Sequence, residues 1–265
     1  MPYVFKEPHR PKAWRQYRWR NRNPLALPFL FVEWTSEWAA WFLGRWVFLE
    51  VLEYCGTLSI LVGVIFYFAG TRDRREQRHY QAWQVINTAQ GKGGNGGRID
   101  ALQDLNADGI PLVAVDLSGG AYLQNINLAG AELLRADISG ADLRGANLRR
   151  VDLAESSLGA TNFRGADLAW AKLGGADLFG ADLTGANLSG VDLDKTDLDQ
   201  ADLRNADLSG ITNWQSIKSL KLANILNCRN APDGFRSWAL AAGAVEIQSD
   251  DQWNALIVAS TQPSR

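Results

Sequence analysis

A large apolar residue recurs at every fifth position from Leu123 to Leu208, eighteen times in succession. Sixteen of these residues are Leu, and the other two are Ile138 and Phe163. The position two residues earlier is Ala in twelve of the eighteen repeats. A five-residue period fits neither an α-helix, with about 3.6 residues per turn, nor a strand, in which side chains alternate. The period therefore indicates an internal repeat.

Within each repeat, the large residue and its small partner are regularly apolar, whereas the other three positions are mostly polar or Gly. Two side chains thus turn inward and three outward, and Gly often stands where a corner would fall. We expect the chain to turn after each repeat and to close into coils that stack at the backbone spacing of a sheet, about 4.8 Å. The predicted repeat core includes eight residues in the middle of the block: Leu143, Leu148, Leu153, Leu158, Phe163, Leu168, Leu173 and Leu178.

Segments such as Ala141–Gly145 and Ala181–Gly185 carry the pattern Ala-(Asp/Asn)-Leu-x-Gly. This pattern resembles the pentapeptide-repeat family. The resemblance implies an all-β fold, a right-handed quadrilateral β-helix with four repeats per coil and about five coils over residues 112–210. Positions twenty residues apart would then stack. An earlier copy of the pattern is offset by one residue, which predicts a bulge at Gly119-Gly120.

The outward positions predict regular polar rows on the faces of the stack. One row contains Asn127, Asn147, Asp167, Asn187 and Asp207, for which an amide ladder is favoured over a ligand site. A second row alternates basic and acidic residues and predicts a solvated salt lattice; its members are Arg144, Arg164, Arg204, Asp142, Asp182 and Asp202.

Two large apolar residues stand at positions that should face solvent. Trp170 and Phe179 are expected on adjacent faces of the same coil. Single exposed apolar residues are common, whereas two lying close together indicate a docking patch. Both are therefore candidate partner contacts.

An apolar segment at residues 46–70 is the second major feature. It has no charged residue from Tyr54 to Gly70, and a basic cluster follows it, composed of Arg72, Arg74, Arg75 and Arg78. With its preceding turns the segment predicts a transmembrane helix across about 30 Å of hydrocarbon, and a core helix of a globular domain is the alternative. The basic flank predicts a single-pass protein of the bacterial inner membrane whose β-helix faces the cytoplasm.

Residues 29–45 place Trp34, Trp38 and Trp41 on one side of a helix. This spacing predicts an interfacial helix in the headgroup region and makes the three Trp residues further candidate partner contacts. A membrane hairpin with the following segment is the competing interpretation. The preceding tail, residues 1–28, is basic and aromatic, and its position beside a membrane segment favours the lipid bilayer or an acidic protein surface as its partner.

Helical segments are expected at both ends of the coils. Residues 72–97 predict a cytoplasmic helix and a Gly-rich linker, and residues 98–111 predict an N-terminal cap with Gly109 in a left-handed conformation. Asp104 to Gly109 also matches the first half of a calcium loop, but the twelfth position lacks a carboxylate, so a cap is favoured. Residues 211–265 predict a C-terminal cap, whose expected core contains Trp214, Trp238 and Trp253.

No pattern in the chain proposes catalysis. The two His residues lie far from any nucleophile motif, and the two Cys residues are isolated. We therefore expect no enzyme activity, cofactor or metal. The favoured function is a non-catalytic, membrane-anchored interaction scaffold that presents the β-helix to a protein partner, with a membrane complex as one candidate; the patterns specify no oligomeric state.

The resemblance also implies an alternative function. Some pentapeptide-repeat proteins resemble DNA and bind a topoisomerase, and the acidic coils 166–210, with nine acids against three bases, fit this description. The apolar segment and the basic tail argue against it, because such mimics are acidic and soluble. Nucleic acid itself is not expected as a partner.

Overall fold

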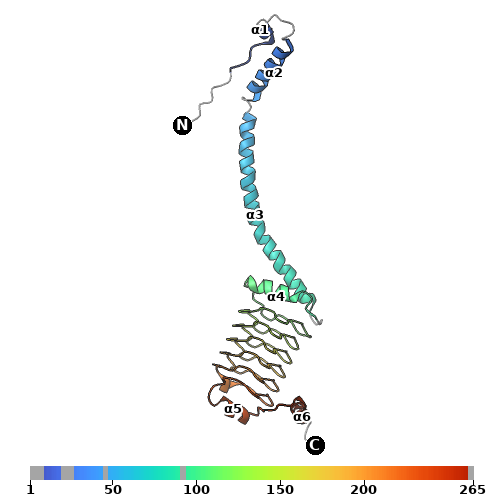
Figure 1. Cartoon of the computed structure of the whole chain (residues 1–265), viewed down its shortest axis with the longest axis vertical. Coiled ribbons are helices and arrows are strands. Elements are labelled where there is room, and N and C mark those ends of the chain that lie inside the picture. Colours follow the sequence, from blue (N-terminus) through green and yellow to red (C-terminus); the bar gives the residue numbers. More distant parts are fainter. Residues whose placement is uncertain (1–8, 19–26, 44–46, 90–93, 262–265) are drawn as a thin grey trace. The chain divides into compact units, whose positions relative to one another are not determined.

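A computed structural model describes residues 9–18, 27–43, 47–89 and 94–261. The chain divides into two compact units, Met1–Arg74 and Arg75–Arg265. The α-helices are labelled in Figure 1. The helix bounds are α1 Trp14–Arg18, α2 Leu27–Leu43, α3 Val47–Thr88, α4 Arg98–Ala107, the 3-10 helix η2 Trp214–Ser216, α5 Phe235–Ala241 and α6 Asp250–Thr261. Helix α3 contributes its first part to one unit and its last part to the other.

In the first unit, aromatic rings join α1 to α2. The Trp14 ring lies 5.3 Å from the Phe31 ring and 5.5 Å from the Trp34 ring, measured between centroids. The Trp34 indole N–H donates a hydrogen bond to the Lys12 carbonyl at 2.9 Å. The Arg10 guanidinium lies over the Trp38 ring, 5.9 Å from its centroid. The aromatic side of α2 is thus packed against the segment that precedes it.

The predicted transmembrane helix and the predicted inner-membrane localisation are wrong. Within the described ranges, every helix falls short of the apolar length that crossing a bilayer would need. The longest charge-free stretch of α3, the eighteen residues from Tyr54 to Thr71, is shorter than the ~20 of a spanning helix, and it belongs to a longer helix with charged residues on either side. The transmembrane helix at 46–70, the inner-membrane localisation and the lipid bilayer as partner are therefore corrected. The predicted tail, residues 1–28, lies largely outside the described residues.

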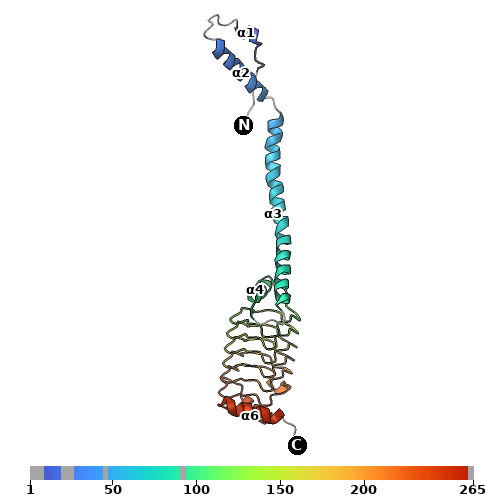
Figure 2. The same cartoon turned by 90° about the vertical axis from the view of Figure 1, so that its right-hand side faces the viewer.

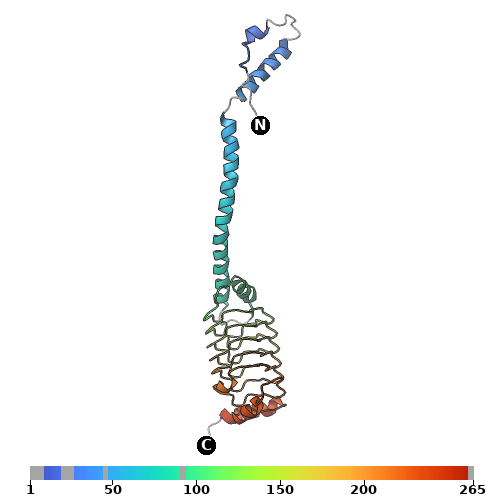
Figure 3. The same ribbon diagram turned by 90° about the vertical axis from the view of Figure 1, so that its left-hand side faces the viewer.

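The second unit is built from stacked coils, visible as rungs in Figures 1, 2 and 3. Isolated parallel β-bridges join residues twenty apart, as in the column Tyr122, Asp142, Asn162, Asp182 and Asp202. The N–H of each large apolar residue donates to the next coil, such as Leu143 to the Asn162 carbonyl at 2.8 Å. The predicted stacking of positions twenty residues apart is confirmed.

The predicted all-β class is wrong. The described residues contain single-residue bridges but no extended strand, and they include helices of up to 42 residues. The reason lies in the repeat itself. A turn takes up the residues after each Leu, so only one residue per repeat forms a β-bridge with the neighbouring coil.

Each corner is a turn, and at many corners two kinds of hydrogen bond close it. The Ala146 N–H donates to the Leu143 carbonyl at 3.0 Å, and Gly145 between them has a left-handed φ of 66°. The carboxylate of Asp137 accepts the N–H of Ser139 at 3.0 Å, two residues later, and this Asx contact recurs along the stack. Corner geometry therefore explains why Asp or Asn so often precedes Leu.

The eight residues of the predicted repeat core are at most 2% exposed. Polar residues that replace Ala in the inner row keep their hydroxyls satisfied, as Thr161 does by donating to the Ile138 carbonyl at 2.8 Å. The remaining space along the Leu rows is about 10 Å³, too small to hold water comfortably. The coils therefore enclose a dry, filled interior.

Helix α4 covers the first coil. Leu102 and Leu105 are fully buried. The Gln103 side-chain carbonyl accepts a hydrogen bond from the Asn127 N–H at 2.9 Å, and so replaces the backbone carbonyl that a preceding coil would supply. Gly109 ends the helix with a φ of 69°, as predicted. Asp108 of the calcium-like motif forms a hydrogen bond with the His79 ring, with 2.7 Å between Nε2 of His79 and a carboxylate oxygen of Asp108. Its carboxylate is thus engaged by α3 in the second unit.

The coil register shifts at two points before the last pairing, Asn224 with Val245, which also departs from the twenty-residue spacing. Bridges pair Asp116 with Asp137 but Tyr122 with Asp142, so one extra residue lies between them, where Gly119 and Gly120 both have φ of 78°. This confirms the predicted bulge. A second insertion accompanies η2, because Asp197 pairs with Ser219 instead of the residue twenty positions later.

Helices α5 and α6 follow the last coil. Phe235 of α5 is buried, and its ring lies 5.7 Å from Trp214 and 6.2 Å from Trp238. The Trp253 indole N–H of α6 donates to the Leu222 carbonyl at 2.8 Å. These contacts cover the Leu rows at the end opposite α4, since Phe235 lines the same internal space.

Replacing a central core residue by an acid should unfold the stack. Leu173→Asp would place an unpaired carboxylate in the dry interior and cost on the order of 3–5 kcal/mol, a large share of a typical domain's stability. Thermal unfolding followed by circular dichroism measures this, with Ala129→Asp on the exposed face as the control. An unchanged melting temperature for Leu173→Asp would contradict the position of this residue.

Candidate interaction surface

The Cys side chain of the second unit is partly buried and hydrogen-bonded within the fold. Burial raises the pKa of the Cys228 thiol to about 12, and this thiol donates to the Leu203 carbonyl at 3.1 Å. A thiol with such a pKa is a poor nucleophile at neutral pH. Over the described ranges, no group of three or more His, Cys, Asp and Glu residues is arranged to hold a metal ion.

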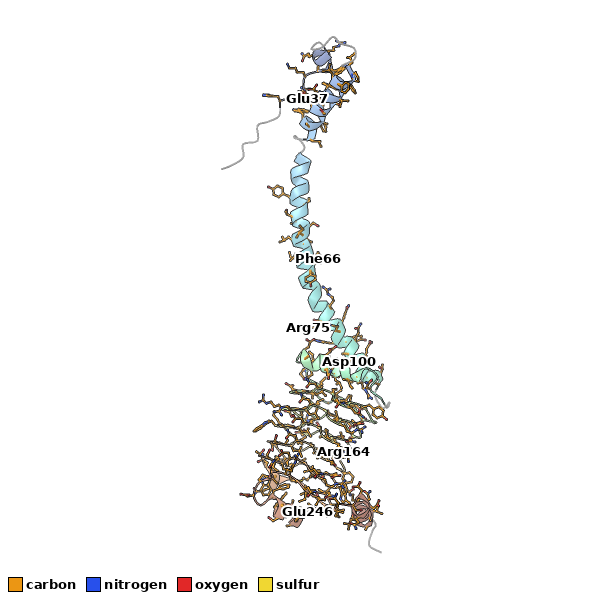
Figure 4. The ribbon with its side chains drawn as sticks, viewed as in Figure 1. Glu37, Phe66, Arg75, Asp100, Arg164 and Glu246 are labelled. Atoms are coloured by element: carbon orange, nitrogen blue, oxygen red, sulfur yellow. The ribbon has the colours of Figure 1, made fainter. Side chains whose placement is uncertain are left out.

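Charged residues of the coils pair in a lattice. Among residues 112–210, seven of the eight bases lie within 4.0 Å of a carboxylate, for example Lys172 with Asp152 at 2.8 Å. The seven are Arg135, Arg144, Arg149, Arg164, Lys172, Lys195 and Arg204, and Arg164 is labelled in Figure 4. Arg150 is the exception in this part of the structure. Most pairs are exposed, and each contributes little to stability.

The predicted amide row forms in part. The Asn147 side-chain amide donates to the Asn127 side-chain carbonyl at 2.9 Å, and Asn187 donates to the Asp167 carboxylate at 3.0 Å. At the end of the row, Asp207 accepts a hydrogen bond at 3.1 Å from the side-chain amide of Asn230, which is adjacent to its bridge partner Arg229. These contacts use the polar atoms between neighbouring coils.

The acidic coils 166–210 carry fewer free carboxylates than their composition indicates. Five of their nine acids pair with a base: Asp167, Asp182, Asp194, Asp197 and Asp202. Arg204 bridges Asp202 and Asp250 of α6, and these contacts raise its pKa. The acidic surface is thus interrupted by cations.

Trp170 stands at a corner in a backbone conformation that disfavours large side chains. Its φ is 63°, and it is the only aromatic residue with a left-handed φ among the described residues. Its side chain remains 60% exposed. The left-handed region costs a residue with a side chain roughly 1–2 kcal/mol relative to its ordinary conformation. This exposed aromatic corner is the main candidate for function.

Glycine in the next coil makes room for the Trp170 ring. A Cβ atom on Gly190, twenty residues later, would lie 2.5 Å from a ring carbon of Trp170. The ring therefore lies directly over the Gly190 backbone. The sequence places Trp170 outward, but the role of Gly190 depends on the stacking register and could not be read from the repeat alone.

Phe179 lies on a different corner from Trp170. The coil has left-handed corners at Gly165, Trp170, Gly175 and Gly180, and Phe179, which is 48% exposed, adjoins the last of these. Nine residues is almost half of a twenty-residue coil, so the two aromatic side chains occupy opposite corners. The structure therefore does not bring them into one patch.

The other predicted site residues lie in α2 and α3. Trp34, Trp38 and Trp41 are half-buried, and successive rings contact each other at centroid distances of 6.2 and 5.4 Å. Arg74 lies over the Tyr67 ring at 5.5 Å, and Arg75 approaches the Asp108 carboxylate at 4.0 Å. Arg78 is exposed, and the side chain of Arg72 lies outside the described part of the structure.

Sequence reasoning missed Arg98, which is fully buried at the start of α4. Its guanidinium donates to the Gly94 carbonyl and to the carbonyls of Asn95 and Ala89 at 3.3 and 3.2 Å. These bonds satisfy carbonyl groups where α3 ends. Burial lowers the pKa of Arg98. An Arg at a helix start carries no sequence signal for such a role.

Because the Trp170 ring contacts Gly190, replacing Gly190 by Ala should lower the stability more than the same change at another glycine corner. Gly190→Ala and Gly185→Ala impose the same strain, because their φ values are 69° and 66°, but only the first would collide with a side chain. Gly190→Ala should lower the free energy of unfolding by about 1 kcal/mol more than Gly185→Ala. Denaturant unfolding measures the difference, which should vanish in a Trp170→Gly background.

The Asp142 carboxylate predicts an acid-dependent contribution to stability. Hydrogen bonds, first from Arg144 and then from Gln124, lower its pKa to about 2, against about 3.9 in an unfolded chain. A lowered native pKa stabilises the fold above the unfolded pKa, and this stabilisation disappears as the pH falls towards 2. Urea unfolding of Asp142→Asn and the unaltered chain should show a gap that narrows from pH 4 to 2; a constant gap would contradict the pairing.

Comparisons with known proteins cover the coils. A model described as pentapeptide repeats, with eight copies, matches residues 112–153, 143–178 and 171–210. A crystal structure of Rfr23, a pentapeptide repeat protein of the cyanobacterium Cyanothece, is 36% identical over 35% of this chain and 58% of its own, with a TM-score of 0.28. The match thus spans just over half of that protein's length.

A pentapeptide repeat protein of the Arabidopsis thaliana thylakoid lumen is 26% identical over 49% of this chain and 88% of its own, with a TM-score of 0.33. QnrB1, a plasmid-mediated fluoroquinolone resistance protein, is 19% identical over 58% and 86%, with a TM-score of 0.25. No curated protein matches the chain significantly. The family model and the five-residue period agree that residues 112–210 consist of pentapeptide repeats.

Proposed function

We propose that this protein is a non-catalytic interaction scaffold, whose capped coils hold the Trp170 side chain in place for a protein partner. Trp170 carries the proposal. It combines a strained backbone with an aromatic surface that is 60% exposed. Trp is among the residues that most often dominate the energy of protein interfaces.

The coils suit this role because they fix the corner on a rigid support. The backbone N–H of Trp170 donates to the Ser189 carbonyl at 2.8 Å, and the Ala171 N–H closes the turn onto the Leu168 carbonyl at 2.9 Å. Both neighbouring apolar residues are buried. A partner would therefore bind a side chain whose backbone is already ordered, which lowers the entropic cost of association.

The packing of reactive groups supports a role without catalysis. The Cys228 thiol is buried, and the His79 ring is engaged by Asp108. DNA mimicry, the alternative from the sequence, receives less support. It requires rows of free carboxylates, whereas five acids of the coils 166–210 pair with cations.

Quantitative affinity capture with the full chain tests the proposal. Trp170→Gly should reduce recovery of the specific partner at least tenfold, the loss expected for an interface Trp worth about 1.4 kcal/mol or more. The same change should leave the melting temperature equal or higher, because Gly relieves the left-handed strain. Phe179→Ala, at the opposite corner, is the matched control and should retain binding.

An identical set of captured proteins for the unaltered chain and Trp170→Gly would contradict this function. Loss of binding with Phe179→Ala but not with Trp170→Gly would place the interface on the opposite corner. A fall in melting temperature with Trp170→Gly would show instead that the ring serves the fold.

A further inference from the structure

Arg150 departs from the charge pattern of the coils. The other seven bases in residues 112–210 each lie beside a carboxylate, whereas Arg150 has no such partner within the described stack and its side chain is exposed. The nearby acids are used elsewhere. Asp152 pairs with Lys172 at 2.8 Å, and Asp167 pairs with Arg149 at 3.0 Å. Arg150 is thus a surplus cation in a lattice that is otherwise paired.

Arg150 lies one coil below Trp170 on the same corner. Its N–H donates to the Ala169 carbonyl at 2.9 Å, just as the Trp170 N–H donates to the Ser189 carbonyl at 2.8 Å. These bonds set the two corner backbones at the spacing of adjacent strands, about 4.8 Å. We name this column of residues the Trp170 corner: Gly130, Arg150, Trp170, Gly190 and Gly210.

The Trp170 corner is bare on both sides of its two large residues. Gly130 precedes them, and Gly190 and Gly210 follow. Arg150, like Trp170, has a left-handed φ, at 57°, where Gly would be unstrained. The Trp170 ring lies over Gly190 and so extends away from Arg150. The corner therefore offers an aromatic surface and a separate free guanidinium, one coil apart.

We infer that the Trp170 corner binds an acidic segment of a protein partner, with a carboxylate on Arg150 and an apolar side chain on the Trp170 ring. This inference rests on the proposed function and adds the chemistry of the partner. A guanidinium binds a carboxylate through two parallel hydrogen bonds, and Trp supplies a large apolar surface. Because no carboxylate of the coils fills this role, the partner supplies it.

The surrounding charge favours a short acidic protein segment over nucleic acid. Residues 112–210 hold fifteen acids and eight bases, a net charge of −7. Nucleic acid carries a dense row of phosphates, and binding it requires several cations along one face. A peptide with one or two carboxylates can pair with Arg150, and it avoids the extended charge repulsion that a long polyanion would experience beside the acidic coils.

A random twelve-residue peptide library displayed on phage, selected on the full chain, tests this inference. Selected peptides should be enriched in Asp or Glu next to a large apolar residue. Fluorescence anisotropy of the most enriched peptide should show at least tenfold weaker binding to Arg150→Glu and to Trp170→Gly. Lys195→Glu is the matched control, because Lys195 is also an exposed corner cation with a φ of 54°.

The possible outcomes distinguish the acidic-peptide inference from the proposed scaffold function. Peptides that require Trp170 but show no acidic preference, and bind Arg150→Glu unchanged, would overturn this inference while leaving the proposed function intact. Failure to select any peptide that depends on Trp170 would overturn it as well, and affinity capture would then decide the proposed function independently. Equal or tighter Arg150-dependent binding of a single-stranded DNA 12-mer would assign the corner to nucleic acid instead.

Discussion

The backbone hydrogen bonds between successive coils are the interactions on which the rest of the second unit depends. They form only if the chain turns a corner after every repeat, and this requires a left-handed residue at each corner, as at Gly145 with a φ of 66°. Gly meets this requirement at no steric cost, whereas other residues do so under strain. Burial of the Leu rows stabilises the stack and offsets that strain. Each coil contributes apolar contacts only to its immediate neighbours.

The period in the sequence was sufficient to predict how the coils stack, because a uniform repeat determines which residues are inside. It also located the bulge at Gly119-Gly120, and the glycine that follows the helical segment 98–108 located the end of α4 at Gly109. The strand content was wrong, since most of each repeat serves the turn. The membrane span at 46–70 was wrong as well, because its uncharged length was too short and was judged apart from the whole of helix α3.

The candidate surface was only partly predictable. The period places Trp170 and Phe179 outside, but their separation follows from the number of corners in each coil, which sets them half a coil apart. The importance of Gly190 and Arg150 depends on side chains twenty residues away and on which charges pair. A sequence shows that a base is present, whereas only the packed lattice shows that Arg150 lacks a carboxylate.

The corners, more than the flat faces, are where this architecture can carry a specific interaction. On the faces, Asp and Asn side chains cap turns and join neighbouring coils, so their polar atoms are already used. Elsewhere two strained corners share an internal contact, where Arg135 pairs with Glu155 at 2.7 Å. Arg150 has no comparable internal pairing, and Trp170 leaves most of its ring to solvent. Because strain in a stacked repeat is local, a single corner can bear it without weakening the stack, and under the proposed function the binding of a partner would offset it.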